Sequence, residues 1–176
     1  PRKKEGKKII IGTVRRLVPE KRIDDLIHAF AQMNKPLRER CALWIIGGGP
    51  EETMLKGLVE KLQLSNVIFY GHVDNTKVIE LLRSIDIFVN PSIQEGMATA
   101  VLEAMGAHCA VVGIRYCAND EVIMDEFNGL LYEPKDVKDL QQKLEQLAKS
   151  RSLRKTLALK GYETVHMKYD LKNISK

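Results

Sequence analysis

Two glutamates eight residues apart could together bind neighbouring hydroxyl groups. Glu95 lies in a loop after an apolar segment, and Glu103 lies one turn into an expected helix over residues 99–107. Helical side chains lean toward the amino end of their helix, so the Glu103 carboxylate is predicted to point at the mouth of that loop. Carboxylates accept paired hydrogen bonds from adjacent sugar hydroxyls, which favours a binding role. The alternative is structural, because a Glu near a helix start also complements the helix dipole.

The elements around these glutamates are expected to form a strand–helix–strand unit. An apolar strand over residues 85–89 precedes the loop, and a second strand over residues 110–112 follows the helix. The loop then lies at the carboxyl end of a parallel strand, where open α/β sheets bind their ligands. The amino end of the helix offers unpaired N–H groups and the positive end of its dipole, so an anion such as phosphate is favoured there.

The stretch EGMATAVLEAMG, with its E-x7-E spacing, resembles the donor-site signature of retaining glycosyltransferases of family four, which have the GT-B fold. The resemblance extends from Ile9 to about Tyr169 and covers what would be the carboxyl-terminal half of such an enzyme. It implies a domain that binds a UDP- or GDP-sugar without a metal, for transfer of a hexosyl group to a glycan, lipid or other acceptor. The acceptor would bind to a preceding domain, missing from this chain, so this half alone is expected to be inactive.

The resemblance also implies roles for individual residues. Glu95 would face the transferred sugar, Glu103 would bind the ribose, and Arg16 and Lys21, in the loop after the first strand (residues 8–14), would grip the diphosphate. Two cations there could stabilise a leaving diphosphate without a metal, and a cation near a helix start otherwise works against the dipole. The neighbouring Arg15 is interpreted as ordinary surface charge. The remaining expected donor contacts are Gly96, Met97, Ala98, Thr99, Gly47, Gly71 and His72.

Three departures from the family pattern leave a second interpretation open. The family usually has glycine where this chain has Arg15, Ala98 and the pair Cys117–Ala118. A Cβ restricts the backbone, so these changes could alter the fit of the diphosphate loop. The alternative is therefore a non-catalytic, Rossmann-like interaction module that has lost donor binding.

The order of apolar segments predicts the fold class. Six expected strands alternate with helices along the 176 residues. This order is typical of an α/β fold with a Rossmann-like, doubly wound parallel sheet in three αβα layers. We expect one such donor-binding domain over residues 9–170. Residues 171–176 would begin a crossover segment that is cut short, and a chain that starts with Pro is expected to be a piece of a longer protein.

Charge restricts the class of partner. The formal net charge is +5, and residues 1–8 hold five basic residues and one acidic residue, which gives +4 for that segment alone. This basic run is interpreted as a linker or terminal segment, and no nucleic-acid partner is expected. Association of the full enzyme with an acidic membrane surface is left open.

Other classes of protein are not supported by the sequence. The three cysteines and four histidines lack metal-ligand spacing, so no metal site is expected. An odd number of cysteines without a framework suits a reducing compartment and favours a cytoplasmic location. No apolar run reaches the roughly 18 residues of a membrane span. The glycines at 47–49 lack the third glycine of GxGxxG and follow the second strand, which disfavours NAD.

Overall fold

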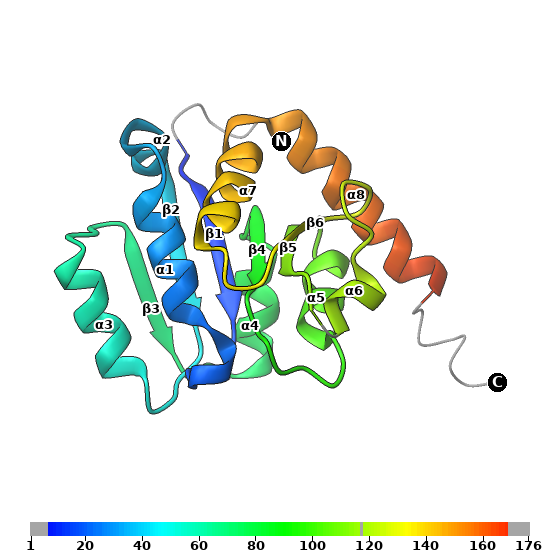
Figure 1. Cartoon of the computed structure of the whole chain (residues 1–176). Helices are drawn as coiled ribbons and strands as arrows, with labels where there is room; N and C mark the ends of the chain where they lie inside the picture. The colour runs from blue at the N-terminus through cyan, green and yellow to red at the C-terminus, as the bar shows by residue number, and fades with distance from the viewer. Residues whose placement is uncertain (1–6, 117, 169–176) are drawn as a thin grey trace.

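The chain folds around one parallel sheet of six strands (Figure 1). The structure is a computed structural model that describes residues 7–116 and 118–168. Most of the basic run, Cys117 and the expected crossover segment at 171–176 lie outside these described residues. The strands are β1 (Ile9–Val14), β2 (Cys41–Ile46), β3 (Val67–Gly71), β4 (Ile87–Asn90), β5 (Ala110–Ile114) and β6 (Leu130–Tyr132). The predicted α/β class and parallel six-stranded sheet are confirmed.

Helices cover both faces of the sheet, which explains why the strands are apolar without alternation. In β1, Ile9 and Ile11 belong to one buried cluster, and Ile10 belongs to the cluster on the opposite face. In β5, Val112 and Val111 are divided in the same way. The sheet is therefore the middle layer of three, as predicted.

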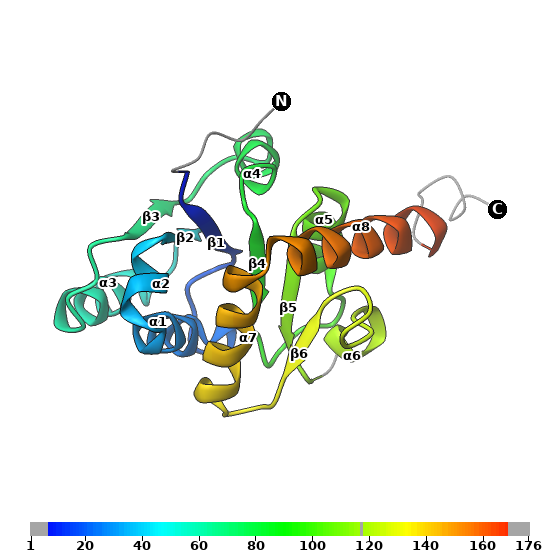
Figure 2. The ribbon, with the colours of Figure 1, turned by 90° about the horizontal axis from the view of Figure 1, so that it is seen from above.

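The helices divide between two outer layers, and Figure 2 shows α1, α3 and α7 on one side with α4 and α5 on the other. The first layer contains α1 (Ile23–Gln32), α2 (Lys35–Glu39), α3 (Glu52–Lys61) and α7 (Val137–Lys149), and the short η1 (Pro19–Lys21), which buries no residue, precedes α1. The second contains α4 (Asn75–Leu82), α5 (Thr99–Gly106) and α6 (Ala118–Val122). The last helix, α8 (Arg151–Lys168), contacts both α7 and α5. The short segments η1 and α2 were not expected from the sequence.

After β5 the apolar pattern of the sequence predicts a loop over residues 114–120, and the structure differs from it. The strand continues through Ile114, and α6 begins at Ala118. A buried polar network lies in this segment, in which Asn119 accepts a hydrogen bond from Asn90 Nδ2 at 2.8 Å and donates one to the Ile114 carbonyl at 3.0 Å. Side-chain amides that fix a backbone in this way leave no trace in an apolar pattern.

The strand order β3-β2-β1-β4-β5-β6 places a reversal of direction between β1 and β4. Chain connections run one way from β1 through β2 to β3 and the other way from β4 through β5 to β6. Such a reversal opens a crevice at the carboxyl ends of the strands, which is where doubly wound sheets bind ligands. The loops after β1 and β4 therefore meet at this crevice.

Candidate functional site

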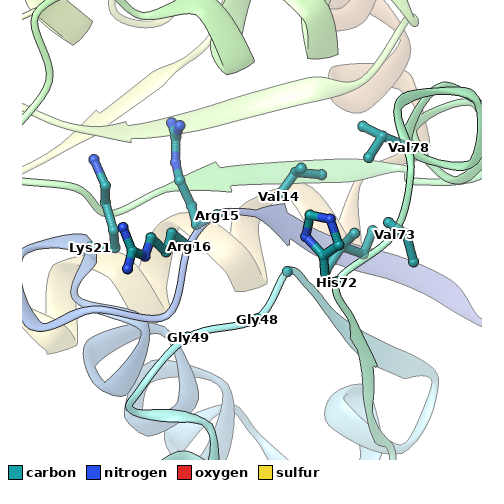
Figure 3. Close-up of a pocket in the computed structure, with 11 residues that line it drawn as sticks. Val14, Arg15, Arg16, Lys21, Gly48, Gly49, His72, Val73 and Val78 are labelled. Carbon is teal, nitrogen blue, oxygen red and sulfur yellow. The ribbon is translucent and has the colours of Figure 1, made fainter.

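A cavity of about 660 Å³ lies at the carboxyl ends of β1, β2 and β3 (Figure 3). Three cations from the loop after β1 line it, namely Arg15, Arg16 and Lys21. The opposite wall comes from the glycines at 47–49 and from His72, and Val14, Val73 and Val78 also line the cavity. This volume lies within the range of about 300–1,000 Å³ that is usual for small-molecule sites.

The glycine turn after β2 packs directly against the cationic loop. Gly47 has a φ of +131°, and a Cβ there would lie 1.9 Å from the Arg15 carbonyl oxygen. Backbone hydrogen bonds of 2.9 Å run from Arg15 N–H to the Ile46 carbonyl and from Leu17 N–H to the Gly48 carbonyl. Only glycine fits this close approach, so the turn has a structural reason that is independent of any ligand. The turn holds the backbone at Arg15 and Leu17 in place, and so fixes the position from which the cationic side chains extend.

The loop after β3 is joined to the same wall. The Gly47 N–H donates to the Gly71 carbonyl at 2.9 Å, and His72 follows directly. In Figure 3 the His72 ring lies beside the glycine turn, across the cavity from the cations. Gly47 and His72 thus line one wall, whereas Gly71 is hydrogen-bonded to Gly47 and does not itself line the cavity.

Glu95 joins the cations from the loop after β4. One of its oxygens, Oε1, lies 3.2 Å from Arg15 Nη1 and 3.1 Å from Lys21 Nζ. Lys21 Nζ also donates to the Gln94 carbonyl at 2.9 Å. The side chains of Arg15, Glu95 and Lys21 are 9%, 10% and 20% exposed, respectively. This three-residue cluster connects the loops on the two sides of the strand reversal.

The interpretation of Arg15 as ordinary surface charge is wrong. Its side chain is buried, and burial lowers the pKa of the guanidinium from its ordinary value, whereas the charges of Glu95 and Glu103 raise it. Among the described residues, its Nε and Nη2 have no hydrogen-bond partner. Its place directly after a buried strand was the available signal, since the first loop residue of such a strand faces the crevice.

Arg16 lines the same cavity but is exposed. Figure 3 shows the side chains of Arg15 and Lys21 pointing to the same side of the loop, while that of Arg16 turns another way. Arg16 and Lys21, the two cations expected to bind the diphosphate, therefore line the same cavity. Glu95 does not line it but forms an ion pair with Lys21, which does.

Glu103 lies in a neighbouring cavity of about 410 Å³ between α4 and α5. Its side chain is exposed, and Asn75 and Arg83 line the same cavity. Val78 lines both cavities, and Glu103 is near enough to raise the pKa of Arg15. The single crevice expected from the sequence is thus two adjoining cavities, with Glu103 in the second.

The start of α5 is open to a ligand. Gly96, Met97 and Thr99 are exposed, and the N-cap residue Ala98 is buried. The N-cap makes no side-chain hydrogen bond, so the first N–H groups of the helix keep their capacity to bind an anion. Ala98 has a φ of −78°, so alanine at this family glycine position carries no backbone strain.

Residues 7–116 and 118–168 hold no group of three or more His, Cys, Asp or Glu side chains suited to a metal ion. No helix within the same ranges has both the length and the apolar character required to cross a bilayer.

Comparison with known proteins connects this geometry to a family. The family model described as glycosyl transferases group 1 matches residues 1–164. The glycosyltransferase MJ1069 of Methanocaldococcus jannaschii is 30% identical over 149 residues, which cover 84% of this chain and 38% of that protein. Across four such curated relatives the matched part spans 38% to 44% of each, so this chain corresponds to about two fifths of their length.

Solved structures show the same likeness. The carboxyl-terminal domain of LpcC, a glycosyl transferase group 1 family protein of Francisella tularensis, has a TM-score of 0.86 and 31% identity, covering 94% of this chain and 88% of that one. A mutant of TarM from S. aureus, in complex with fondaparinux, alpha-GlcNAc-glycerol and UDP, has a TM-score of 0.89 and 28% identity, covering 99% of this chain and 35% of that one. The chain therefore belongs to the glycosyl transferases group 1 family, and it has the fold of the carboxyl-terminal domain of a GT-B enzyme.

Proposed function

We propose that the chain is the donor-binding domain of a retaining glycosyltransferase, which transfers a hexosyl group from a UDP- or GDP-sugar to a glycan, lipid or other acceptor. The observation that carries this proposal is the cation-lined cavity at the strand reversal, with Glu95 held beside it by Arg15 and Lys21. The TarM structure similar to this chain contains UDP, which supports a uridine nucleotide as the first ligand to test.

The diphosphate would lie between the cations and the start of α5. Arg16 and Lys21 line the cavity, and the uncapped N–H groups of α5 supply donors that need no side chain. Both sources of positive charge would stabilise the negative charge that develops on the diphosphate as the glycosidic bond breaks. Because these donors are fixed by the fold, they need little rearrangement during the reaction.

The two glutamates would act on the hydroxyl groups at either end of the diphosphate. Glu103 would accept hydrogen bonds from the ribose in the cavity between α4 and α5. Glu95 would face the transferred sugar with its second oxygen, since both cations contact Oε1. A carboxylate held on one oxygen keeps acceptor capacity on the other.

The acceptor and its binding groups would belong to another domain of the whole protein. The matched region covers only about two fifths of the curated relatives, as reported above, and the chain alone would bind donor without transferring sugar. We place the protein in the cytoplasm, where the buried free thiols of Cys41 and Cys109 suit a reducing environment.

Isothermal titration calorimetry with UDP and GDP tests donor binding. We expect a dissociation constant in the range of about 0.1–5 mM for one of the two nucleotides, because half of the enzyme supplies only part of the contacts. Arg16→Ala should weaken binding, and Lys149→Ala, at the exposed end of α7, is the matched control for loss of one positive charge. If the unmodified chain binds neither nucleotide, the domain is a module without donor binding and the proposal fails.

A further inference from the structure

The buried guanidinium of Arg15 forms an ion pair through Nη1, and its Nε and Nη2 are unpaired among the described residues. Its Nη1 contacts Glu95 Oε1 at 3.2 Å. Its Nε and Nη2 are screened from solvent and have no hydrogen-bond partner within the part of the chain that the structure describes. The side chain as a whole is only 9% exposed, although the residue lines the larger cavity.

The two free nitrogens lie along one edge of the guanidinium plane. Their N–H bonds point in nearly the same direction, which is the arrangement by which arginine grips two oxygens of one carboxylate or phosphate. Lysine cannot reproduce this contact, because its ammonium is a point charge without a planar fork. The free edge of Arg15 is therefore shaped for an anion with two oxygens.

A buried donor without an acceptor destabilises the folded protein, and the effect is larger for a charged group. Two such donors on one residue are unusual in a native fold, where buried polar groups are nearly all paired. The loss is recovered when an acceptor binds against them. This pattern is expected where a chain keeps a donor pair for a ligand.

We propose that the Nε–Nη2 edge of Arg15 is a subsite for an oxyanion of the sugar donor. The oxyanion is either a phosphate group of the nucleotide or the carboxylate of an acidic transferred sugar. This inference rests on the proposed function and adds a third cation to it, since the resemblance assigns the diphosphate to Arg16 and Lys21 only. Arg15 stands where the family usually has glycine, so the subsite distinguishes this chain from that pattern.

The position of Arg15 supports both sources of the oxyanion. It is adjacent to Arg16 in the chain, and it shares the Glu95 oxygen with Lys21. Glu95 is the residue expected to face the transferred sugar, so Arg15 lies between the diphosphate cations and the sugar. Because its free nitrogens are screened from solvent, binding requires a shift of nearby residues, and we expect the loop carrying Glu95 to change its exposure.

Titration of the chain and of Arg15→Lys with UDP, UDP-glucose and UDP-glucuronate separates the possibilities. Arg15→Lys keeps the positive charge beside Glu95 and removes only the fork. Arg151→Lys, at the exposed start of α8, is the matched control, and thermal unfolding confirms that each variant is folded. Hydrogen exchange over residues 92–98, with and without ligand, is measured in parallel as a second readout.

Two results would support the subsite. An affinity for all three ligands that falls about ten-fold or more in Arg15→Lys places a phosphate on the fork. A preference of about ten-fold for UDP-glucuronate over UDP-glucose, lost in Arg15→Lys while UDP is unaffected, places a sugar carboxylate there. In either case exchange over residues 92–98 should change when ligand binds.

Other results would overturn it. If the chain binds nucleotides and Arg15→Lys binds them equally well, the subsite is wrong and the proposed function stands. An equal loss of affinity in Arg151→Lys would mean that the effect does not depend on the guanidinium at position 15. If the unmodified chain binds none of the three ligands but binds GDP, this inference fails as stated and the proposed function stands. If it does not bind GDP either, both fail.

Discussion

The cluster of Arg15, Glu95 and Lys21 predicts an asymmetry in stability between two substitutions that break the same ion pair. Glu95→Gln leaves the buried Arg15 charge without its carboxylate, on a side chain that is 9% exposed. Arg15→Met leaves Glu95 with Lys21 at 3.1 Å and removes two buried nitrogens that have no partner among the described residues. The first change therefore leaves a buried charge without its partner, whereas the second removes two unpaired donors and leaves Glu95 paired with Lys21.

The expected magnitudes follow from the burial of the partners. Breaking a fully buried pair by removing one partner costs about 3–5 kcal/mol. Lys21 and Glu95 keep some contact with solvent, so we expect Glu95→Gln to lower the free energy of unfolding by about 2–3 kcal/mol. For a chain of this length that is a fall in Tm of about 4–12 °C. Arg15→Met should change the free energy of unfolding by no more than about 1 kcal/mol, because relief of the unpaired donors offsets the lost attraction.

Urea unfolding of the chain, both single variants and the double variant measures these differences and the Arg15–Glu95 coupling energy. Lys21→Met is the control for a more exposed cation, and it should cost no more than about 1 kcal/mol. Equal losses for Glu95→Gln and Arg15→Met, or a larger loss for Arg15→Met, would refute the reasoning that the Arg15 charge is under-compensated.

Three further predictions follow from individual sites. Gly47→Ala should lower the free energy of unfolding by more than about 2 kcal/mol in a urea titration, because its Cβ would strike the loop after β1. The control is Gly57→Ala, which has open space around it in α3 and should raise the free energy of unfolding by up to about 1 kcal/mol. A tolerated Gly47→Ala would count against the close approach of the two loops. Glu103→Ala should weaken UDP binding by about 1–3 kcal/mol in calorimetry if Glu103 holds ribose hydroxyls, and an unchanged affinity would leave it as a complement to the helix dipole. Burial raises the pKa of Cys41 to about 11 and of Cys109 to about 12, so both thiols should resist iodoacetamide at about pH 8 until the chain is unfolded, as read by peptide mass spectrometry. Because folding raises these two thiol pKa values, their contribution to the free energy of unfolding is fully present below about pH 9 and is lost as the pH rises through the pKa values of the folded chain. Rapid labelling of either thiol in the folded chain would contradict its burial.

The sheet and its binding edge could be predicted because their signals are local. Continuous apolar runs such as Ile9–Val14 identify parallel strands buried on both faces, and the alternation of strands and helices then fixes the class of fold. Asp is also a residue type favoured at the start of helices, and the side chain of Asp136, which precedes α7, accepts a hydrogen bond from the Asp139 N–H at 2.8 Å.

The site was predicted less completely because its charges depend on long-range contacts. The ion pair of Arg15 joins it to Glu95, 80 residues later in the chain, and no local pattern records such a contact. The backbone φ at Ala98, which removes the expected strain, is a property of the folded loop and has no sequence pattern of its own. The separate cavity of Glu103 arises from the spacing of α4 and α5, which no motif records.

The central claim is that a nucleotide diphosphate binds at the cationic cavity, and amide chemical shifts of the isotope-labelled chain during a UDP titration test it most directly. We predict saturable shifts for Arg16, Lys21, Gly48 and His72, together with the start of α5. Shifts confined to helices away from this cavity, such as α2 and α8, would contradict the account. So would the absence of shifts at about 5 mM both in this titration and in a parallel titration with GDP.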